Sequence, residues 1–194
     1  MKHQRGFTIA ELIIVVIIAA VLAAIAAPNM SEFVKNNSRA TRVNTMVTAL
    51  NYARGQAVTR NARVSLCKSV NGATCDVAPG NFATGWMVFT DGGARGTVDG
   101  TDTVLRIFQP DMGNNATLIG VKDIPSVQIR GITYENTGLG ADLNPPVGAT
   151  VVTQNTVFRY CDDRGTPDGR GIFVSTTGFP RLVEDLTTLG MACP

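Results

Sequence analysis

Histidine is almost absent from this chain of 194 residues: the single one is His3, in a short polar segment ahead of a long apolar run. A chain without histidine elsewhere lacks Ser-His and Cys-His nucleophile pairs and the commonest metal ligand. Carboxylate pairs or Ser-Lys chemistry would remain open to it, but no such constellation stands out. We therefore expect the protein to be no enzyme and to hold no cofactor and no metal.

The chain also lacks an excess of positive or negative charge once its first six residues are set aside. Of the 17 basic side chains, Lys2 and Arg5 belong to the first six residues, and the remaining 15 equal the 15 acidic side chains in number. Residues 7–194 are therefore formally neutral. No global positive field draws this part of the chain to nucleic acid.

What the chain does have is one long apolar run, from Ile9 to Ala27, which Pro28 closes and only Glu11 interrupts. At ~1.5 Å per residue, a helix of this length spans roughly 28 Å, close to the thickness of the hydrocarbon core of a bilayer. A carboxylate inside such a run costs on the order of 2.5–3.5 kcal/mol at the helix centre, and less near the end. The run therefore predicts a membrane helix whose acid has a function.

Three simpler interpretations compete with this one. A cleaved signal peptide also has a basic start, and the Ala-rich end of the run near Ala27 could offer its cleavage site, but its apolar region is usually shorter. A plain signal anchor would explain the helix but not Glu11. A buried core helix rarely extends this far without a polar face.

The segment Gly6-Phe7-Thr8-Ile9-Ala10-Glu11 resembles the N-terminal signal of type IV pilins and type II secretion pseudopilins. That signal has a short basic leader ending in Gly, an aromatic residue that becomes the new N-terminus, and an acid at the fifth mature position. The resemblance implies that a prepilin peptidase cuts between Gly6 and Phe7 and then methylates the amine of Phe7.

The basic residues ahead of the helix keep that end in the cytoplasm by the positive-inside rule, so the domain after Pro28 lies in the periplasm. The resemblance implies that the subunit then leaves the bacterial inner membrane, through an assembly platform, and joins other minor and major pilins or pseudopilins. In the dry filament core, Glu11 would be offset by the amine of Phe7 on a neighbouring subunit. A subunit out of register would bury an unpaired charge, so Glu11 is interpreted as an assembly residue.

Four cysteines, an even number, indicate disulfides in an exported domain, with three connectivities open. Cys67 and Cys75 bracket the turn signal Asn71-Gly72, which favours a local disulfide between them. Cys161 and Cys193 would then tie the last residues back to a strand. A zinc site is the less favoured alternative, because the chain has no CxxC pair.

Beyond Pro28 the helix is expected to continue to about residue 62, with a kink at the proline, which lacks the N–H and crowds the preceding turn. Apolar residues at steps of three and four predict an amphipathic helix, and the arginines beside them are interpreted as a solvated face. The expected stripe consists of Met30, Phe33, Val34, Val43, Val47, Leu50, Ala53, Ala57 and Val58.

From residue 63 the pattern changes to short β-like runs separated by turn residues. Together with the helix they predict an α+β fold, in which the long N-terminal helix packs on one face of a mostly antiparallel sheet. The expected organisation is a leader (1–6), a transmembrane helix (7–28), its amphipathic continuation (29–62) and a β-rich exported domain (63–194). The predicted strands are 64–66, 85–89, 103–108, 116–121, 127–134, 157–160, 171–175 and 181–183.

Two features inside the predicted domain have a simple structural interpretation. The Asp/Gly-rich stretch 91–102 lacks the one-three-five acid spacing of an EF-hand, and Arg95 lies in its middle, so we expect a solvated hairpin turn. Trp86 alternates with Val88 along a strand, which places it in the core rather than in a binding site.

Two further segments narrow the resemblance. Residues 85–92 with 103–106 resemble the central hairpin of GspH/FimT-type pilins, and residues 161–165 with 170–175 resemble their C-terminal strands. The resemblance implies a minor pilin or minor pseudopilin, at or near the tip of a type IV pilus or a type II secretion pseudopilus, that helps to start assembly. It does not decide between the two filaments, because both use the same leader and helix.

A DNA receptor is the alternative function, because FimT-like members bind DNA in natural transformation through a C-terminal Gly-Arg-x-Arg motif. This chain has Gly178-Phe179-Pro180-Arg181 at the corresponding place, so only Arg181 of the two arginines is present. Between residues 157 and 194 there are four arginines and five acids. That balance makes a poor phosphate-binding surface unless folding separates the charges, so DNA binding is not favoured.

Overall fold

The computed structural model describes residues 8–110, 112, 115–122, 127–143 and 155–193, and for residues 26–29 and 142 it describes the backbone alone. Gly6 and Phe7 lie outside the described residues. The chain divides into two compact units, Met1–Thr41 and Arg42–Pro194. The second unit therefore begins within the helix rather than at residue 63.

The helix α1 (Ile9–Arg60) is continuous over 52 residues, and its second half is part of the second unit. There one stripe of the helix is buried, at steps of three and four residues. Four residues of the expected apolar stripe, Met30, Phe33, Val34 and Val58, are at least half exposed. The buried residues are Val43, Met46, Ala49, Leu50, Ala53 and Ala57.

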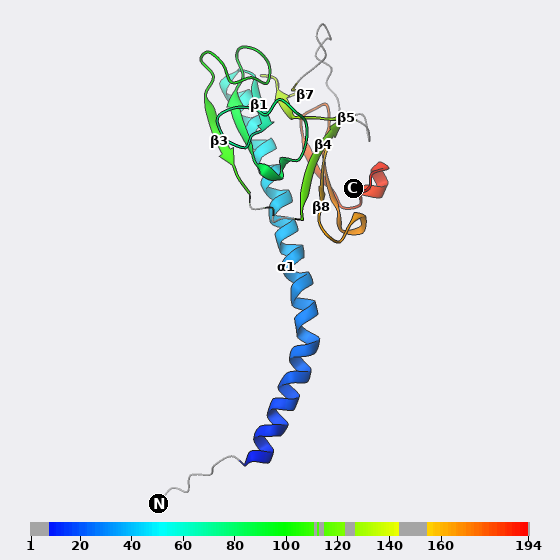
Figure 1. The fold of residues 1–194 in the computed structure, drawn as a ribbon. Coiled ribbons are helices and arrows are strands. Elements are labelled where there is room, and N and C mark those ends of the chain that lie inside the picture. The colour runs from blue at the N-terminus through cyan, green and yellow to red at the C-terminus, as the bar shows by residue number, and fades with distance from the viewer. Residues whose placement is uncertain (1–7, 111, 113–114, 123–126, 144–154, 194) are drawn as a thin grey trace, which may run out of the picture. The chain divides into compact units, whose positions relative to one another are not determined.

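The β-strands of the second unit form two five-stranded sheets rather than one, and every described pairing is antiparallel. Figure 1 shows the sheets beside the second half of α1. The first sheet has the order β3 (Val104–Phe108), β2 (Trp86–Thr90), β1 (Val64–Lys68), β6 (Gly131–Tyr134) and β7 (Gly140–Asp142). The second has the order β10 (Pro180–Val183), β9 (Arg170–Val174), β8 (Thr156–Cys161), β4 (Thr117–Lys122) and β5 (Val127–Gln128).

One hydrophobic core joins the helix to the inner face of both sheets. The buried stripe of α1 packs in one cluster with Leu66 and Trp86 of the first sheet and with Phe158 and Tyr160 of the second. Trp86 is fully buried, as its alternating pattern predicts. Because both sheets share one helix as their packing partner, the two sheets and the second half of α1 fold as one unit.

The outer faces of the sheets are also buried, which the sequence did not predict. Cys67 of β1 and Met87 and Phe89 of β2 belong to a separate cluster on the first sheet. On the second sheet, Val157 and Cys161 of β8 contact residues from the end of the chain. The C-terminal segment therefore covers one face that the helix leaves free, and it includes the short 3-10 helix η3 (Leu186–Leu189). The 3-10 helix η2 (Thr166–Asp168) lies beside that segment, since Thr166 accepts from the amide of Cys193. The 3-10 helix η1 (Phe82–Thr84) instead places Phe82 in the central core.

The predicted strand 127–134 is in fact two strands in different sheets. The amide of Ile129 still donates to the carbonyl of Gly120 on β4 (2.9 Å), whereas the carbonyl of Arg130 accepts from Lys68 at the end of β1 (2.9 Å). The backbone thus changes sheets within two residues. A continuous β-like run cannot reveal this change, because both halves satisfy the same alternation.

Candidate functional site: the apolar helix and the disulfide-bonded domain

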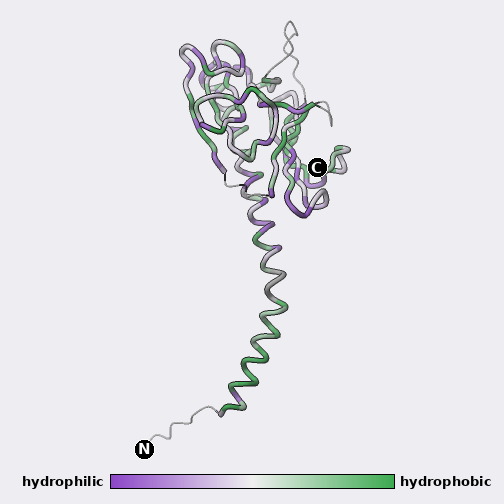
Figure 2. Tube along the Cα trace, viewed as in Figure 1, coloured by the Kyte–Doolittle hydropathy of each residue, from purple (hydrophilic) through white to green (hydrophobic). Residues whose placement is uncertain are grey.

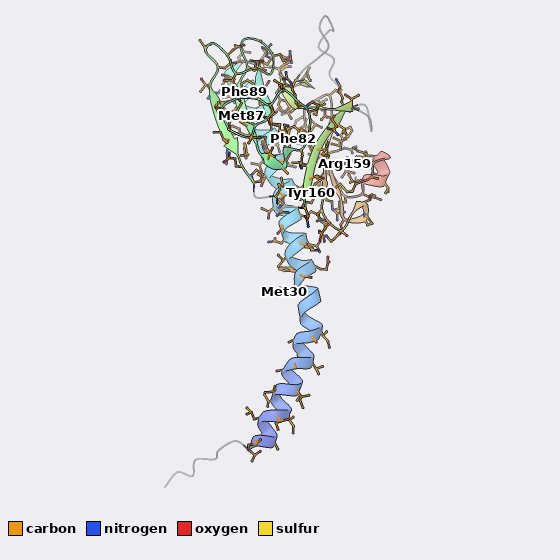
Figure 3. All side chains as sticks on the ribbon, in the orientation of Figure 1. Met30, Phe82, Met87, Phe89, Arg159 and Tyr160 are labelled. Carbon is orange, nitrogen blue, oxygen red and sulfur yellow. A yellow bond between two sulfur atoms is a disulfide. The ribbon has the colours of Figure 1, made fainter. Side chains whose placement is uncertain are left out.

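The first part of α1 presents apolar side chains on all sides. The large side chains between Ile9 and Ile25 are 53 to 80% exposed, and Figure 2 shows this hydrophobic stretch along the helix. The helix is long and apolar enough to cross a membrane, as judged by length and composition. Met30, the labelled side chain beyond this stretch in Figure 3, is also exposed. An exposed apolar surface of this size marks a contact with membrane or protein.

A capping box opens the helix. The backbone N–H and the hydroxyl of Thr8 donate to Oε2 of Glu11, at 3.0 and 3.1 Å, and the backbone N–H of Glu11 donates to Oγ1 of Thr8 at 3.2 Å. Thr8 is the N-cap and Glu11 the third helical residue, so each side chain satisfies a donor that the first turn leaves open. Glu11 therefore has a local structural role that the sequence analysis missed.

The signal for this role is readable in the sequence, because Thr-x-x-Glu before an apolar run is the signature of a capping box. Glu11 lies in the first turn, where the helix dipole favours a negative charge. Pairing of Glu11 with the Phe7 amine of a neighbouring subunit remains a prediction. Cleavage between Gly6 and Phe7, and methylation of Phe7, also remain predictions.

The helix passes through Pro28 without interruption of its helical assignment. A proline inside a helix removes one backbone hydrogen bond, and the remaining turns can still continue across it. The expected kink at Pro28 remains a prediction.

Both disulfides are formed within the second unit. Cys67, at the end of β1, is joined to Cys75, eight residues away, and Cys161, at the end of β8, is joined to Cys193, 32 residues away. This is the pairing favoured by the Asn71-Gly72 turn signal. Asn71 accepts from the amides of residues 73 and 74 at 2.9 and 3.0 Å, which closes the turn inside the first disulfide loop.

The second disulfide ties the C-terminal segment onto the outer face of the second sheet. Leu186 and Met191 pack against Val121 and Val157 there. Arg159 of β8 donates to the carbonyl of Ala192, and the amide of Cys193 donates to the hydroxyl of Thr166 at 3.0 Å. Burial lowers the pKa of the Arg159 guanidinium from its usual value, but an arginine stays charged. The segment is therefore a packed part of the domain.

We expect the two disulfides to differ in their contribution to stability. With loops of 8 and 32 residues, replacement of each cysteine pair by serine should lower the free energy of unfolding by roughly 2.5 and roughly 3.7 kcal/mol, respectively, on the chain-entropy model. Loss of the Cys161–Cys193 disulfide also loosens the C-terminal segment that packs over Val157. Urea unfolding of the full chain in detergent, followed by Trp86 fluorescence, measures both values. An equal or larger loss for the Cys67–Cys75 pair would contradict this ranking.

The stretch 91–102 is more than the solvated turn that the sequence predicted, because Asp91 is fully buried. Asp91 accepts from the guanidinium of Arg63 at 3.1 Å, from the amide of Gly96 at 2.8 Å, and from the hydroxyl of Ser65. Ser65 in turn contacts the hydroxyl of Thr133 at 2.8 Å. Arg63 is thus an internal ion-pair partner, and the interpretation of the arginines as one solvated face was wrong.

Asp91 should be the most stability-sensitive acid of this stretch. Asp91→Ala leaves Arg63 and two buried donors without their acceptor, so we expect the free energy of unfolding to fall by about 3 kcal/mol. Asp99→Ala is the matched control: Asp99 accepts from the amide of Ala94 at 3.0 Å but is not buried, and its loss should cost about 1 kcal/mol. The same urea unfolding measurement applies. Similar losses for the two variants would show that burial of Asp91 is unimportant.

The arginines near the C-terminus are largely engaged inside the domain. Arg164 forms ion pairs with Asp162 at 2.7 Å and Asp168 at 3.5 Å, and Arg170 donates to the carbonyl of Glu184 at 2.9 Å. Arg181 is exposed, and its guanidinium lies 4.6 Å from the ring centroid of Phe173. Three of the four arginines between residues 157 and 194 (Arg159, Arg164 and Arg170) thus bind carboxylates or carbonyls of the domain, and these contacts do not favour the DNA-receptor alternative. In the part of the chain that the structure describes, no three His, Cys, Asp or Glu side chains are grouped to hold a metal.

Comparison with known families gives two matches. The family described as "Type II transport protein GspH" matches residues 42–178, and the "Prokaryotic N-terminal methylation motif" matches residues 1–27. The chain belongs to the GspH family. Its first match covers most of the second unit, and the methylation motif includes the capping box and the apolar start of α1. It is a minor pilin or pseudopilin, and proteins of this class are structural subunits.

Solved structures agree on the fold of this GspH-family chain. A crystal structure of the type IV minor pilin FimU of Pseudomonas aeruginosa matches with a TM-score of 0.54 and 18% identity, over 83% of this chain and 96% of that one. A second crystal form of FimU matches with a TM-score of 0.47 and 18% identity, over 81% of this chain and 96% of that one. No curated protein sequence matches this chain. The first likeness establishes a pilin-like α+β fold, as the sequence predicted.

Proposed function

We propose that this chain is a subunit at or near the tip of a type IV pilus or a type II secretion pseudopilus, where it helps to start assembly. One observation carries the proposal: an apolar helix with its surface exposed lies within the match to the prokaryotic N-terminal methylation motif. Such a helix is stable only in a membrane or among other apolar helices.

The proposed pathway begins in the bacterial inner membrane, with the N-terminus in the cytoplasm and the second unit in the periplasm. Prepilin peptidase removes residues 1–6 and methylates Phe7. The assembly platform then extracts the subunit, and α1 exchanges lipid for the helices of other pilins or pseudopilins. The disulfides suit this route, because the periplasm is an oxidising compartment.

Deletion of the gene in its own bacterium tests the proposal. We expect fewer filaments of unchanged length, or loss of secretion through the corresponding secretion system, because a starting subunit limits how many filaments begin. An epitope on the chain should label one filament end in immunogold micrographs. Normal filament numbers together with normal secretion would refute the proposal.

The same strain separates the two filament types. Loss of surface filaments with normal secretion indicates a type IV pilus, and the reverse indicates a pseudopilus. Loss of DNA uptake with normal filaments would instead indicate the DNA-receptor alternative.

A further inference from the structure

Three segments that are distant in the sequence meet around Arg54 in the last turns of α1. The Nε–H of Arg54 donates to the carbonyl of Gly138, in the turn between β6 and β7, at 3.1 Å. Its guanidinium carbon lies 3.8 Å from the ring centroid of Phe179, in the turn between β9 and β10. We name the surface formed by Arg54, Val58, Leu139 and Phe179 the Arg54 patch.

The two turns beneath the patch are held rigidly against each other. Gly138 and Gly178 both have φ of +81°, and a Cβ on Gly178 would lie 2.2 Å from the carbonyl oxygen of Gly138, so only glycine fits there. Each turn is closed by a 2.8 Å hydrogen bond from its glycine amide, and the amide of Gly140 donates to the carbonyl of Thr176 at 3.3 Å. A surface that is ordered in advance loses little entropy on binding.

The patch is apolar and exposed. Val58 is 50% exposed, Leu139 41% and Phe179 57%. Single exposed apolar residues are ordinary, but three of them around one arginine form a contiguous patch, and aromatic residues and arginine are the types that dominate binding energy at interfaces. The composition therefore indicates a docking surface.

The charge of the patch is positive, and among the residues that the structure describes Arg54 forms no ion pair with an acid. Glu135, at the start of the turn that holds Gly138, is engaged by Arg95 at 2.6 Å. Arg60, the next arginine along α1, donates to the neutral side chain of Gln56 at 2.8 Å. Tyr134 lies under Gly178, fully buried, and its hydroxyl has no hydrogen-bond partner among the described residues. Burial raises the pKa of Tyr134 far above its usual value, so it adds no negative charge.

We propose that the Arg54 patch docks a neighbouring pilin-class subunit through a surface that combines a carboxylate with apolar side chains. The carboxylate complements Arg54, and the apolar side chains cover Val58, Leu139 and Phe179. The patch includes the last turns of α1 and belongs wholly to the second unit. This inference rests on the proposed function and names the surface through which that function is carried out.

Photo-cross-linking of the full chain in its own bacterium tests the inference. A benzoylphenylalanine at Leu139 should cross-link to another pilin-class subunit, at a segment that contains Asp or Glu. The matched control is Ile107, which is 50% exposed on β3 at the opposite edge of the same sheet from β7. We expect benzoylphenylalanine at position 107 to give at most about one tenth of the product obtained from position 139, because position 107 lies outside the patch.

Three variants define the contact. Phe179→Ser and Arg54→Gln should each lower the yield from position 139 by about tenfold, and Arg60→Gln should leave it unchanged. Phe179→Ser removes the ring that stacks on Arg54 but keeps the two groups of the Arg54–Gly138 hydrogen bond, so it tests the patch even if Arg54→Gln loosens the turns. Non-reducing peptide mapping that finds both disulfides in each variant confirms that the variants are folded.

Each outcome decides the inference. A product with a second copy of this chain, a product at a segment without acids, an unchanged yield in Phe179→Ser, or no product at position 139 would overturn it. The sheared filament fraction is collected in the same experiment. If the chain is in that fraction but gives none of the expected product, the patch inference fails and the proposed function stands. Absence of the chain from filaments would overturn both.

Discussion

Glu11→Ala should abolish recruitment of the subunit into filaments while leaving its membrane insertion intact or slightly improved. Insertion benefits because an intramembrane carboxylate is costly. Recruitment fails because the Phe7 amine of a neighbouring subunit would be buried without its counter-charge, which costs several kcal/mol. We expect the amount of chain in sheared filaments to fall on the order of tenfold or more, since ~1.4 kcal/mol already corresponds to tenfold.

The capping box allows a series of variants that separates the charge of Glu11 from its role in capping the helix. Glu11→Gln keeps a side chain that can cap the helix but removes the charge, and Thr8→Ala keeps the charge but removes the cap. If charge pairing sets the register, Glu11→Gln should behave like Glu11→Ala. Thr8→Ala should then be mild, because loss of a helix cap costs about 1 kcal/mol and the following apolar turns are held by their surroundings.

Cross-linking between exported domains and partner subunits, quantified beside the filament fraction, measures this series. Cleavage after Gly6 should proceed in all three variants, because the scissile bond lies outside the apolar run. Normal recruitment of Glu11→Gln with failure of Thr8→Ala would assign the effect to the helix start instead of the charge.

Gly6→Glu should block processing completely and leave an uncut precursor in the inner membrane. A peptidase that reads the backbone beside the bilayer has little room for a side chain at this position, so Gly6→Ala should also be processed poorly. Gln4→Glu adds the same charge two residues earlier and should be cut normally. Intact-mass measurement of the membrane fraction distinguishes loss of residues 1–6 from the full chain.

Normal loss of residues 1–6 from Gly6→Glu would refute the steric argument. A mature N-terminus after Ala27 in the wild-type chain would instead show that the apolar run is a cleaved signal peptide. In that case Glu11 would be absent from the mature protein and could not act in assembly.

Several features of the site could be predicted because their signals are local. Glu11 lies four residues after Phe7 and is the single interruption of the apolar run 9–27. Asn71-Gly72 between two cysteines predicts a turn that brings their sulfurs together. Thr8 could have been found in the same way, from the Thr-x-x-Glu signature. Local signals need only the geometry of one helix or one turn, which the neighbouring residues determine.

Other features depend on contacts between residues far apart in the chain. The residues from 127 to 134 read as one strand, but pairing with Gly120 and then with Lys68 places them in two sheets. Asp91 resembles any other acid of a turn, yet it binds Arg63, just before β1, and Ser65 of β1. Ser65 also contacts Thr133 of β6, and Asp91 is fully buried in this arrangement.

The sequence by itself thus determined an apolar helix long enough to cross a membrane, the acid at its start, the α+β class and the favoured pairing of the cysteines, because periodicity, spacing and turn chemistry act over a few residues. Only the tertiary structure decided that there are two sheets, that the C-terminal segment covers one of them, and that Arg54 joins two distant turns into an exposed patch. The physical reason is that burial and charge pairing depend on which segments meet in space, and many pairings of short β-strands satisfy the same alternating pattern.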